Sequence, residues 1–240
     1  MPGIKSLLED KRGKHKLSDF VKRYWHFENI SNKSIAEFSA DFCRWAQSNG
    51  FRNNEHKALA IYNLARNSIS TLPNSQLTKT IVWENVHILH QIEQSRNNIF
   101  QQMQLLAQAL PEYPVVVAMG GIGDILATRI IAEIGNVRRF YTKNALVAYA
   151  GIDAPPFQSG TFIAQKRHIS KRGNKYLRQT GYEAMQSVMR QKPINDAVYL
   201  FIQKKLSEGK NSKSAKIAGL SKFLKIYYAR VNELYKQIEL

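Results

Sequence analysis

The sequence is short of cysteine, of long apolar runs and of acidic residues. Its single cysteine, Cys43, excludes an intramolecular disulfide and any zinc site built from cysteines. The longest apolar runs, such as 114–119, fall far short of the roughly 18 residues that a membrane-spanning helix needs, so no contact with a membrane is expected. The N-terminus lacks the apolar core of a signal peptide, and the expected location is therefore cytoplasmic.

The scarcity of acids leaves a strong positive charge. The chain has 35 Lys and Arg against 18 Asp and Glu, a formal net charge of +17. Such an excess favours polyanions through counterion release, and DNA is the leading partner class. Basic residues are densest between 166 and 178, where no acid interrupts. The residues expected to contact nucleic acid there are Lys166, Arg167, Lys171, Arg172, Asn174, Lys175 and Arg178.

Hydrophobic periodicity predicts a mainly α fold. Apolar residues recur at helical spacing in 17–25, 35–46, 54–68, 198–206 and 215–234, and only 115–118 and 157–164 are plausible strands. We divide the chain into a helical leader (1–76), a coiled-coil helix (77–110) and a C-terminal domain (111–240). Within the last, 114–135 carries a helix-hairpin-helix pattern, 151–190 a serine loop and basic motif, and 191–240 a basic helical tail.

The segment 78–110 shows a heptad pattern. Seven of nine seam positions are apolar, and Asn85 and Arg96 are the exceptions. The pattern predicts a coiled coil and a homo-oligomer, and the alternative is a long helix packed on its own domain. The apolar seam consists of Val82, Leu89, Ile92, Ile99, Met103, Leu106 and Leu110.

Two glycines, Gly121 and Gly123, lie in the turn of the helix-hairpin-helix pattern. Glycines let the main chain approach a phosphate, and the amides at the start of the next helix attract it. A dinucleotide-binding fingerprint is disfavoured because leucine stands at position 126 where the third glycine belongs. The alternative to phosphate binding is a hairpin that only packs.

Ser159 lies in a loop just before the basic track, with Gly160 beside it. A nucleophilic serine needs an approachable oxygen, positive groups near the attacked phosphate and a base for its proton. The loop and the track meet the first two needs, and no base is identifiable from the sequence. Without further context, a simple turn explains this Ser-Gly pair.

An ordered set of motifs places these residues in a wider context. The chain from 112 to 190 resembles the C-terminal transposase domain of the IS110 family (IS116/IS110/IS902), the tail resembles it more loosely, and the leader resembles the middle region of longer members. The motifs that carry the resemblance are Gly120-Gly121-Ile122-Gly123, Glu133-Ile134-Gly135, Arg139-Phe140, Ala148-Tyr149-Ala150-Gly151, Ser159-Gly160, Ser170-Lys171-Arg172-Gly173-Asn174 and Tyr176-Leu177-Arg178.

The resemblance implies DNA transposition and recombination by a serine nucleophile, in some members with a structured guide RNA. Carried onto this chain, it places the nucleophile at Ser159. Ser170 is the weaker candidate, since a helix N-cap role would explain it. The resemblance also implies a RuvC-like domain with four acids that hold a divalent metal such as Mg²⁺.

No pattern in this chain matches that acidic domain. Its later acids are scattered, among them Asp124, Glu133, Asp153, Glu183 and Asp196, and its histidines show no paired ligand motif, so no metal or other cofactor is expected within the chain. The chain could be a half that needs a separate RuvC-like chain, an excised fragment, an inactive remnant, or a non-catalytic nucleic-acid-binding module.

Overall fold

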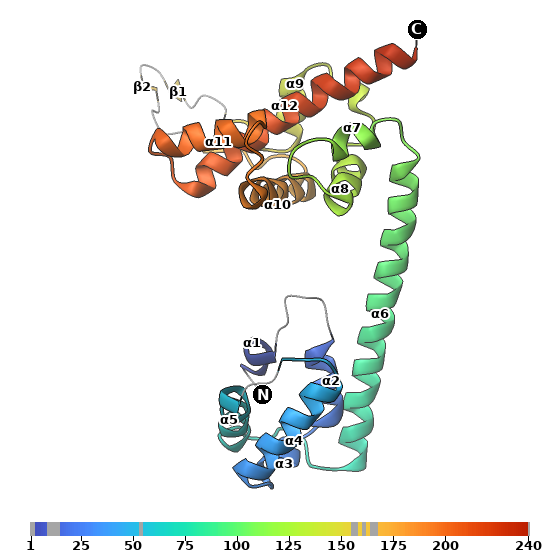
Figure 1. Cartoon of the computed structure of the whole chain (residues 1–240), viewed down its shortest axis with the longest axis vertical. Helices are drawn as coiled ribbons and strands as arrows, with labels where there is room; N and C mark the ends of the chain where they lie inside the picture. The colour runs from blue at the N-terminus through green and yellow to red at the C-terminus, as the bar shows by residue number, and fades with distance from the viewer. Residues whose placement is uncertain are drawn as a thin grey trace. The chain divides into compact units, whose positions relative to one another are not determined.

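The computed structural model describes residues 3–8, 15–52, 55–154, 158–159, 162–163 and 168–239, with backbone only at 158–159 and 162–163. The fold is mainly helical, as the periodicity predicts (Figure 1). It divides into two compact units, Met1–Asn97 and Asn98–Leu240, and the helix α6 (Gln76–Gln108) contains the point of division. The three-part division proposed from the sequence stays a prediction.

The N-terminal unit is a small helical cluster around aromatic side chains. Its helices are α1 (Ile4–Leu8), α2 (Lys16–Arg23), α3 (Glu28–Ser31), α4 (Ile35–Ser48), α5 (Glu55–Arg66) and the first part of α6. The rings of Phe20, Phe42 and Trp45 meet with their centroids about 6 Å apart, the spacing of favourable aromatic pairs. Ser34 caps α4, and Glu37 completes a capping box.

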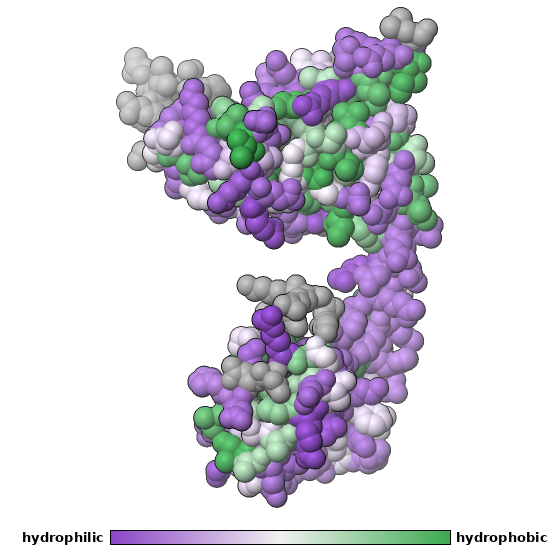
Figure 2. All heavy atoms as spheres, viewed as in Figure 1, coloured by the Kyte–Doolittle hydropathy of each residue, from purple (hydrophilic) through white to green (hydrophobic). Residues whose placement is uncertain are grey.

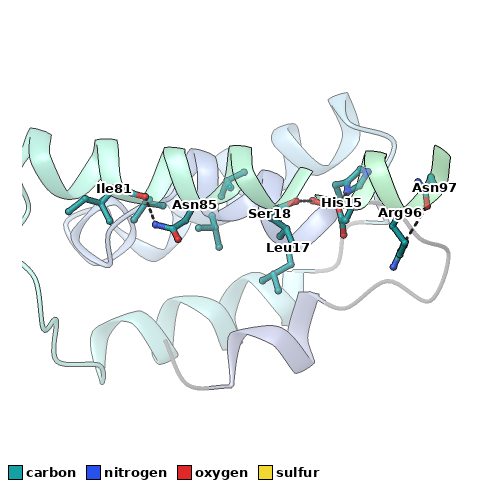
Figure 3. A pocket seen from close by; sticks show the side chains of 12 residues that line it. His15, Leu17, Ser18, Ile81, Asn85, Arg96 and Asn97 are labelled. Atoms are coloured by element: carbon teal, nitrogen blue, oxygen red, sulfur yellow. Dashed lines mark hydrogen bonds and ion pairs between the residues drawn. The ribbon is translucent and has the colours of Figure 1, made fainter. Parts of the chain in front are cut away.

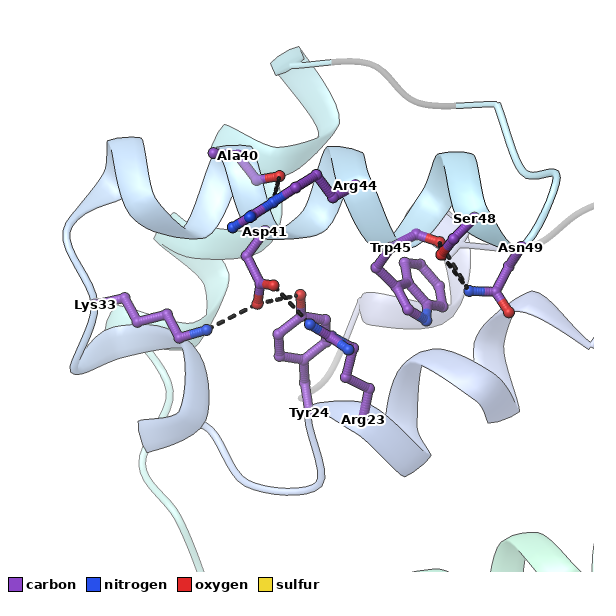
Figure 4. A network of polar contacts seen from close by, with 9 residues as sticks. All are labelled: Arg23, Tyr24, Lys33, Ala40, Asp41, Arg44, Trp45, Ser48 and Asn49. Carbon is purple, nitrogen blue, oxygen red and sulfur yellow. Dashed lines mark hydrogen bonds and ion pairs between the residues drawn. The ribbon is translucent and has the colours of Figure 1, made fainter.

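A polar network at the edge of this unit joins α2 to α4 through Asp41 (Figure 4). The Asp41 carboxylate accepts hydrogen bonds from Arg23 at 2.6 Å, Tyr24 at 2.9 Å and Lys33 at 2.8 Å. Burial alone would raise the pKa of Asp41, but these donors outweigh it and hold the pKa at about 2. The Asp41 carboxylate therefore stays ionised at neutral pH and links the two helices.

The α6 helix has two apolar stripes. One of them packs on α2: Val86 is buried, and the indole nitrogen of Trp83 donates to the carbonyl of Lys22 at 3.0 Å. The predicted heptad seam lies beside this stripe and remains open, with Ile92 61%, Ile99 62% and Leu106 72% exposed. The side of α6 visible in Figure 2 is mostly hydrophilic.

The C-terminal unit surrounds the long helix α12. Its elements are α7 (Tyr113–Val117), α8 (Asp124–Ile134), the short 3-10 helix η1 (Val137–Arg139), α9 (Lys143–Tyr149), β1 (Gln158–Ser159), β2 (Phe162–Ile163), α10 (Lys175–Gln191), α11 (Ala197–Ser207) and α12 (Ser212–Ile238). Helix α12 packs on α7, α9, α10 and α11, and it buries its aromatic residues Phe223 and Tyr227 in the core.

One expectation from the sequence is wrong in this fold. The predicted strand at 115–118 is helical from 115 to 117, because Pro114 lies in the first turn of α7, where proline favours a helix. Cys43 is partly buried. The second predicted strand region contains the two-residue antiparallel pair β1 and β2. Within the described residues, no helix is long and apolar enough to cross a membrane.

Candidate nucleic-acid interface

Asn174 organises the turn between the serine segment and α10. Its side-chain oxygen accepts from the amides of Tyr176 and Leu177 at 2.8 and 3.0 Å and so caps α10. Its amide nitrogen donates to Glu133 at 2.8 Å and to the Tyr149 hydroxyl at 3.2 Å. The side chain therefore ties three helices, α8, α9 and α10, to one point.

Two glycines bring the chain close enough for this arrangement. A Cβ on Gly173 would lie 2.3 Å from the carbonyl oxygen of Tyr149, so no side chain fits there. Gly151 has a φ of +64°, and its carbonyl accepts from the amide of Lys171 at 3.0 Å. The backbone amide of Asn174 donates to Tyr149 at 2.6 Å. Residues 170–175, which we call the basic turn, are thus fastened directly to the end of α9.

The same contacts close the base of the segment that contains Ser159. The amide of Ser170 donates to the carbonyl of Asp153 at 2.8 Å, and its hydroxyl donates to the Asp153 carboxylate. The expectation that Ser170 caps a helix is wrong, because α10 begins only at Lys175 and Asn174 supplies the cap. Ser170 instead holds the two ends of the serine segment together.

Tyr149 and Arg139 extend the site from the basic turn. The guanidinium carbon of Arg139 lies 4.6 Å from the centre of the Tyr149 ring and 4.7 Å from that of Phe140, which are cation-π distances. Hydrogen bonds from Asn174 and then Arg139 outweigh burial and lower the pKa of Tyr149. Arg139 is exposed, so its charge remains available to a ligand.

The basic turn presents its charges to solvent. Lys171, Arg172 and Lys175 are exposed, and the unusual positive φ of Lys171, 55°, is imposed by the turn. Beside them, Tyr176 is 57% exposed and lies under the Lys175 ammonium group, 4.9 Å from its ring centre. An exposed aromatic among cations suits stacking on an unpaired base.

Other predicted contact residues are used inside the fold. Arg178 is half-buried and donates to the carbonyl of Ala150 at 2.9 Å, and every polar atom of the Asn174 side chain has a partner, as described above. Lys166 and Arg167 lie outside the described residues. Ser159 lies in β1 opposite Phe162, and only its backbone is described. The predicted contacts therefore divide into exposed cations and residues that position them.

The glycine turn before α8 places its two predicted glycines differently. Gly121 is buried with a φ of +79°, and a Cβ there would lie 2.7 Å from the backbone of Val188 in α10. Its close approach is therefore to another helix. Gly123 is exposed, has open space around it and precedes α8, whose first two residues are also exposed. The helix-hairpin-helix assignment stays a prediction. Of its two glycines, Gly123 is the one that leaves room for a phosphate.

The five acids named from the sequence of this unit have partners within the fold. Asp124 accepts from Tyr113 at 2.9 Å, Glu183 pairs with Arg129 at 2.5 Å, and Asp196 caps α11. Glu133 and Asp153 hold the basic turn, as described above. In the described part of this unit, these acids hold structural elements together through hydrogen bonds, an ion pair and a helix cap.

Arg139 and Tyr176 were not among the residues selected from the sequence. Both belong to motifs that carry the family resemblance, which was the only signal that could have found them. Spacing alone gives no hint, because Arg139 reaches the basic turn through Tyr149 and tertiary packing.

Comparison with known proteins agrees with the motifs. Residues 114–200 match the family model described as transposase IS116/IS110/IS902 family. A protein of Streptomyces coelicolor (strain ATCC BAA-471 / A3(2) / M145), named "Insertion element IS110 uncharacterized 43.6 kDa protein", is 27% identical over 108 residues, or 45% of this chain. The aligned part covers 26% of that relative. The resemblance is thereby confirmed: residues 114–200 are similar to the transposase IS116/IS110/IS902 family.

Proposed function

We propose that the C-terminal unit binds DNA during transposition of the IS110 type and brings a serine nucleophile to it. The similarity of residues 114–200 supports transposition as the general process. The observation that carries the finer proposal is the basic turn: hydrogen bonds between its residues and 149–153 close the base of the Ser159 segment and present three exposed cations there. A phosphate held by these cations lies next to the segment that carries the serine.

Removing the cations of the basic turn tests the DNA contact. For the triple variant Lys171→Ala, Arg172→Ala, Lys175→Ala we expect weaker DNA binding, with the slope of log affinity against log salt reduced by about 2.7 if each cation neutralises one phosphate. Fluorescence anisotropy with labelled duplex and single-stranded DNA at several salt concentrations measures both quantities. Because the three side chains are exposed, the fold should persist.

A control variant of equal charge separates a local contact from a loss of net charge. Lys204, Lys210 and Lys213 are also exposed lysines of the C-terminal unit. Their triple replacement by alanine should change the slope by much less. Equal slopes for the two triple variants would show that the basic turn is not the DNA contact.

The chemistry of the proposal starts at Ser159. Its hydroxyl oxygen would form a bond to phosphorus while the bond from phosphorus to the departing strand breaks, and the serine proton passes to a base. Exposed Arg139, Lys171 and Arg172 are the described cations that would stabilise charge on the attacked phosphate. We propose that Mg²⁺, and the acids that bind it, belong to a RuvC-like domain outside the described residues.

A non-catalytic nucleic-acid-binding module remains the second candidate. The exposed Tyr176 and its neighbouring cations fit a non-catalytic module as well as they fit a recombinase, since base stacking and phosphate contacts need no serine. The amides at the start of α8 after Gly123 are a further proposed phosphate contact in either case. A structured guide RNA fits the same positive charge, and competition of RNA against DNA in the anisotropy assay distinguishes the two polymers.

We further propose that α6 pairs with a second copy through its heptad seam. Replacing Ile99 and Leu106 with lysine puts two charges on the most exposed part of that seam, so we expect a shift from dimer to monomer in size-exclusion chromatography with light scattering. Gln94→Lys with Gln101→Lys is the matched control, because both positions lie opposite the seam in the heptad. A dimer that survives the seam variant would contradict the pairing.

A further inference from the structure

A cluster of two histidines and a glutamate lies in the N-terminal unit, where α2 begins against α6. One ligand atom from each of His15, His90 and Glu93 lies within 4.8 Å of the other two. His15 directly precedes α2, whereas His90 and Glu93 lie three residues apart on α6 and so share one face of that helix. The two histidines form no paired ligand motif in the sequence because 75 positions separate them.

The contact between His15 and Glu93 is close without being a well-aligned hydrogen bond. His15 Nδ1 lies 2.8 Å from Glu93 Oε2, yet this enclosed oxygen receives no hydrogen bond from the described residues. A nitrogen and a carboxylate oxygen this close need either a proton or a cation between them. In a tetrahedral zinc site the two atoms would be about 3.3 Å apart, given metal bonds of 2.0–2.1 Å.

Ser18 holds the His90 ring by a hydrogen bond. The Ser18 hydroxyl donates to the carbonyl of His15 at 2.9 Å, and its oxygen lies 2.8 Å from His90 Nε2. Since the only hydroxyl proton is used on the carbonyl, His90 Nε2 must carry the proton that it shares with Ser18. The lone pair of the ring then lies on Nδ1, and Ser18 fixes the orientation of the imidazole as outer partners of metal-bound histidines do.

The surroundings allow an ion to enter. His15, Ser18 and Glu93 line an open groove of about 620 Å³ between α2 and α6 (Figure 3). The side chain of His15 is 48% exposed and that of Glu93 is 29% exposed, so an ion in solvent can reach both side chains. Arg96 also lines the groove, but its guanidinium donates to Asn97.

We propose that His15, His90 and Glu93 bind one zinc-class divalent transition-metal ion, with water in the fourth position. Two imidazoles and one carboxylate are a ligand set that Zn²⁺ takes in proteins. The ion clamps the start of α2 onto α6 and joins two helices that are otherwise held there by side-chain contacts. This site would replace the expectation that the histidines hold no metal.

Metal titration of the full chain, without a histidine tag, tests the site. We expect Zn²⁺ to bind with a stoichiometry of one in calorimetry and Co²⁺ to give the visible absorption of a four-coordinate ion. His90→Ala and Glu93→Gln should each weaken binding at least tenfold, and Ser18→Ala, which removes a positioning residue, about 10-fold to 100-fold.

His87→Ala is the matched control, because His87 lies on the same helix, is exposed and contacts only Gln91 among the contacts seen for its ring. It should bind one ion as tightly as the unaltered chain. The proposal is overturned if the unaltered chain binds no ion, or if His90→Ala and Glu93→Gln bind as the control does. Far-UV circular dichroism of each variant without metal shows whether a loss of binding reflects a loss of fold, and a folded variant with weakened binding supports the site.

Discussion

Replacing Gly173 with alanine is expected to destabilise the C-terminal unit by about 3 kcal/mol, the upper end of the usual range for overpacking. The added methyl group would lie 2.3 Å from the carbonyl oxygen of Tyr149 and 2.9 Å from that of Ala148. Both neighbours are backbone atoms at the end of α9, so relief requires the basic turn to separate from α9. The hydrogen bond from Asn174 to Tyr149 would be lost in the same movement.

Urea unfolding can follow the two units separately. All three tryptophans, Trp25, Trp45 and Trp83, belong to Met1–Asn97, whereas far-UV circular dichroism reports helices of both units. For Gly173→Ala we expect the dichroism signal of the C-terminal unit to be lost at lower urea while the tryptophan midpoint stays constant. Gly123→Ser is the control, since Gly123 has open space around it and serine is a good N-cap. An unchanged dichroism curve for Gly173→Ala would contradict the close approach.

Ser159→Ala is expected to abolish the covalent protein–DNA adduct and strand transfer while leaving DNA affinity within about twofold. The substitution removes the oxygen that would bond to phosphorus, and it leaves the exposed cations of the basic turn in place. The assay supplies end-matched DNA, a complementing RuvC-like domain, guide RNA and Mg²⁺, and detects the adduct by denaturing electrophoresis.

Ser170→Ala separates the two candidate serines. The Ser170 hydroxyl is bonded to Asp153 at the base of the segment, so its loss should loosen the turn and slow the reaction without abolishing the adduct. An adduct that persists in Ser159→Ala and disappears in Ser170→Ala would move the nucleophile to Ser170. If the unaltered chain binds DNA in this assay but forms no adduct, the non-catalytic module is the better description.

Local signals in the sequence predicted much of the fold. The helical periodicity of 35–46, which became α4, and the long periodic segment that became α6 each depend on residues within a few turns of one another. Where the prediction failed, a local preference was overruled. The β-branched run after Pro114 favoured a strand, but proline at the start of a helix and packing on α8 and α12 decided for α7.

The candidate site was harder to predict because tertiary contacts decide which of its residues face solvent and which are bonded inside the fold. Asn174 was selected as a nucleic-acid contact, but its bonds to Glu133 and Tyr149 use its side chain inside the fold. Gly121 was selected for a close approach to phosphate, but it approaches α10 instead. Exposed cations such as Lys171 and Arg172 were selected correctly because the density of positive charge can be read directly from the sequence.

The closed base of the serine segment has a consequence for its length. Hydrogen bonds from the amides of Ser170 and Lys171 to the carbonyls of Asp153 and Gly151 fix both ends, so a longer segment between them adds a cost in chain entropy. That cost grows only with the logarithm of length, by about 0.6 kcal/mol for each doubling. The segment that carries the proposed nucleophile can therefore be lengthened or shortened to suit a different nucleic acid while the cations beside it keep their positions.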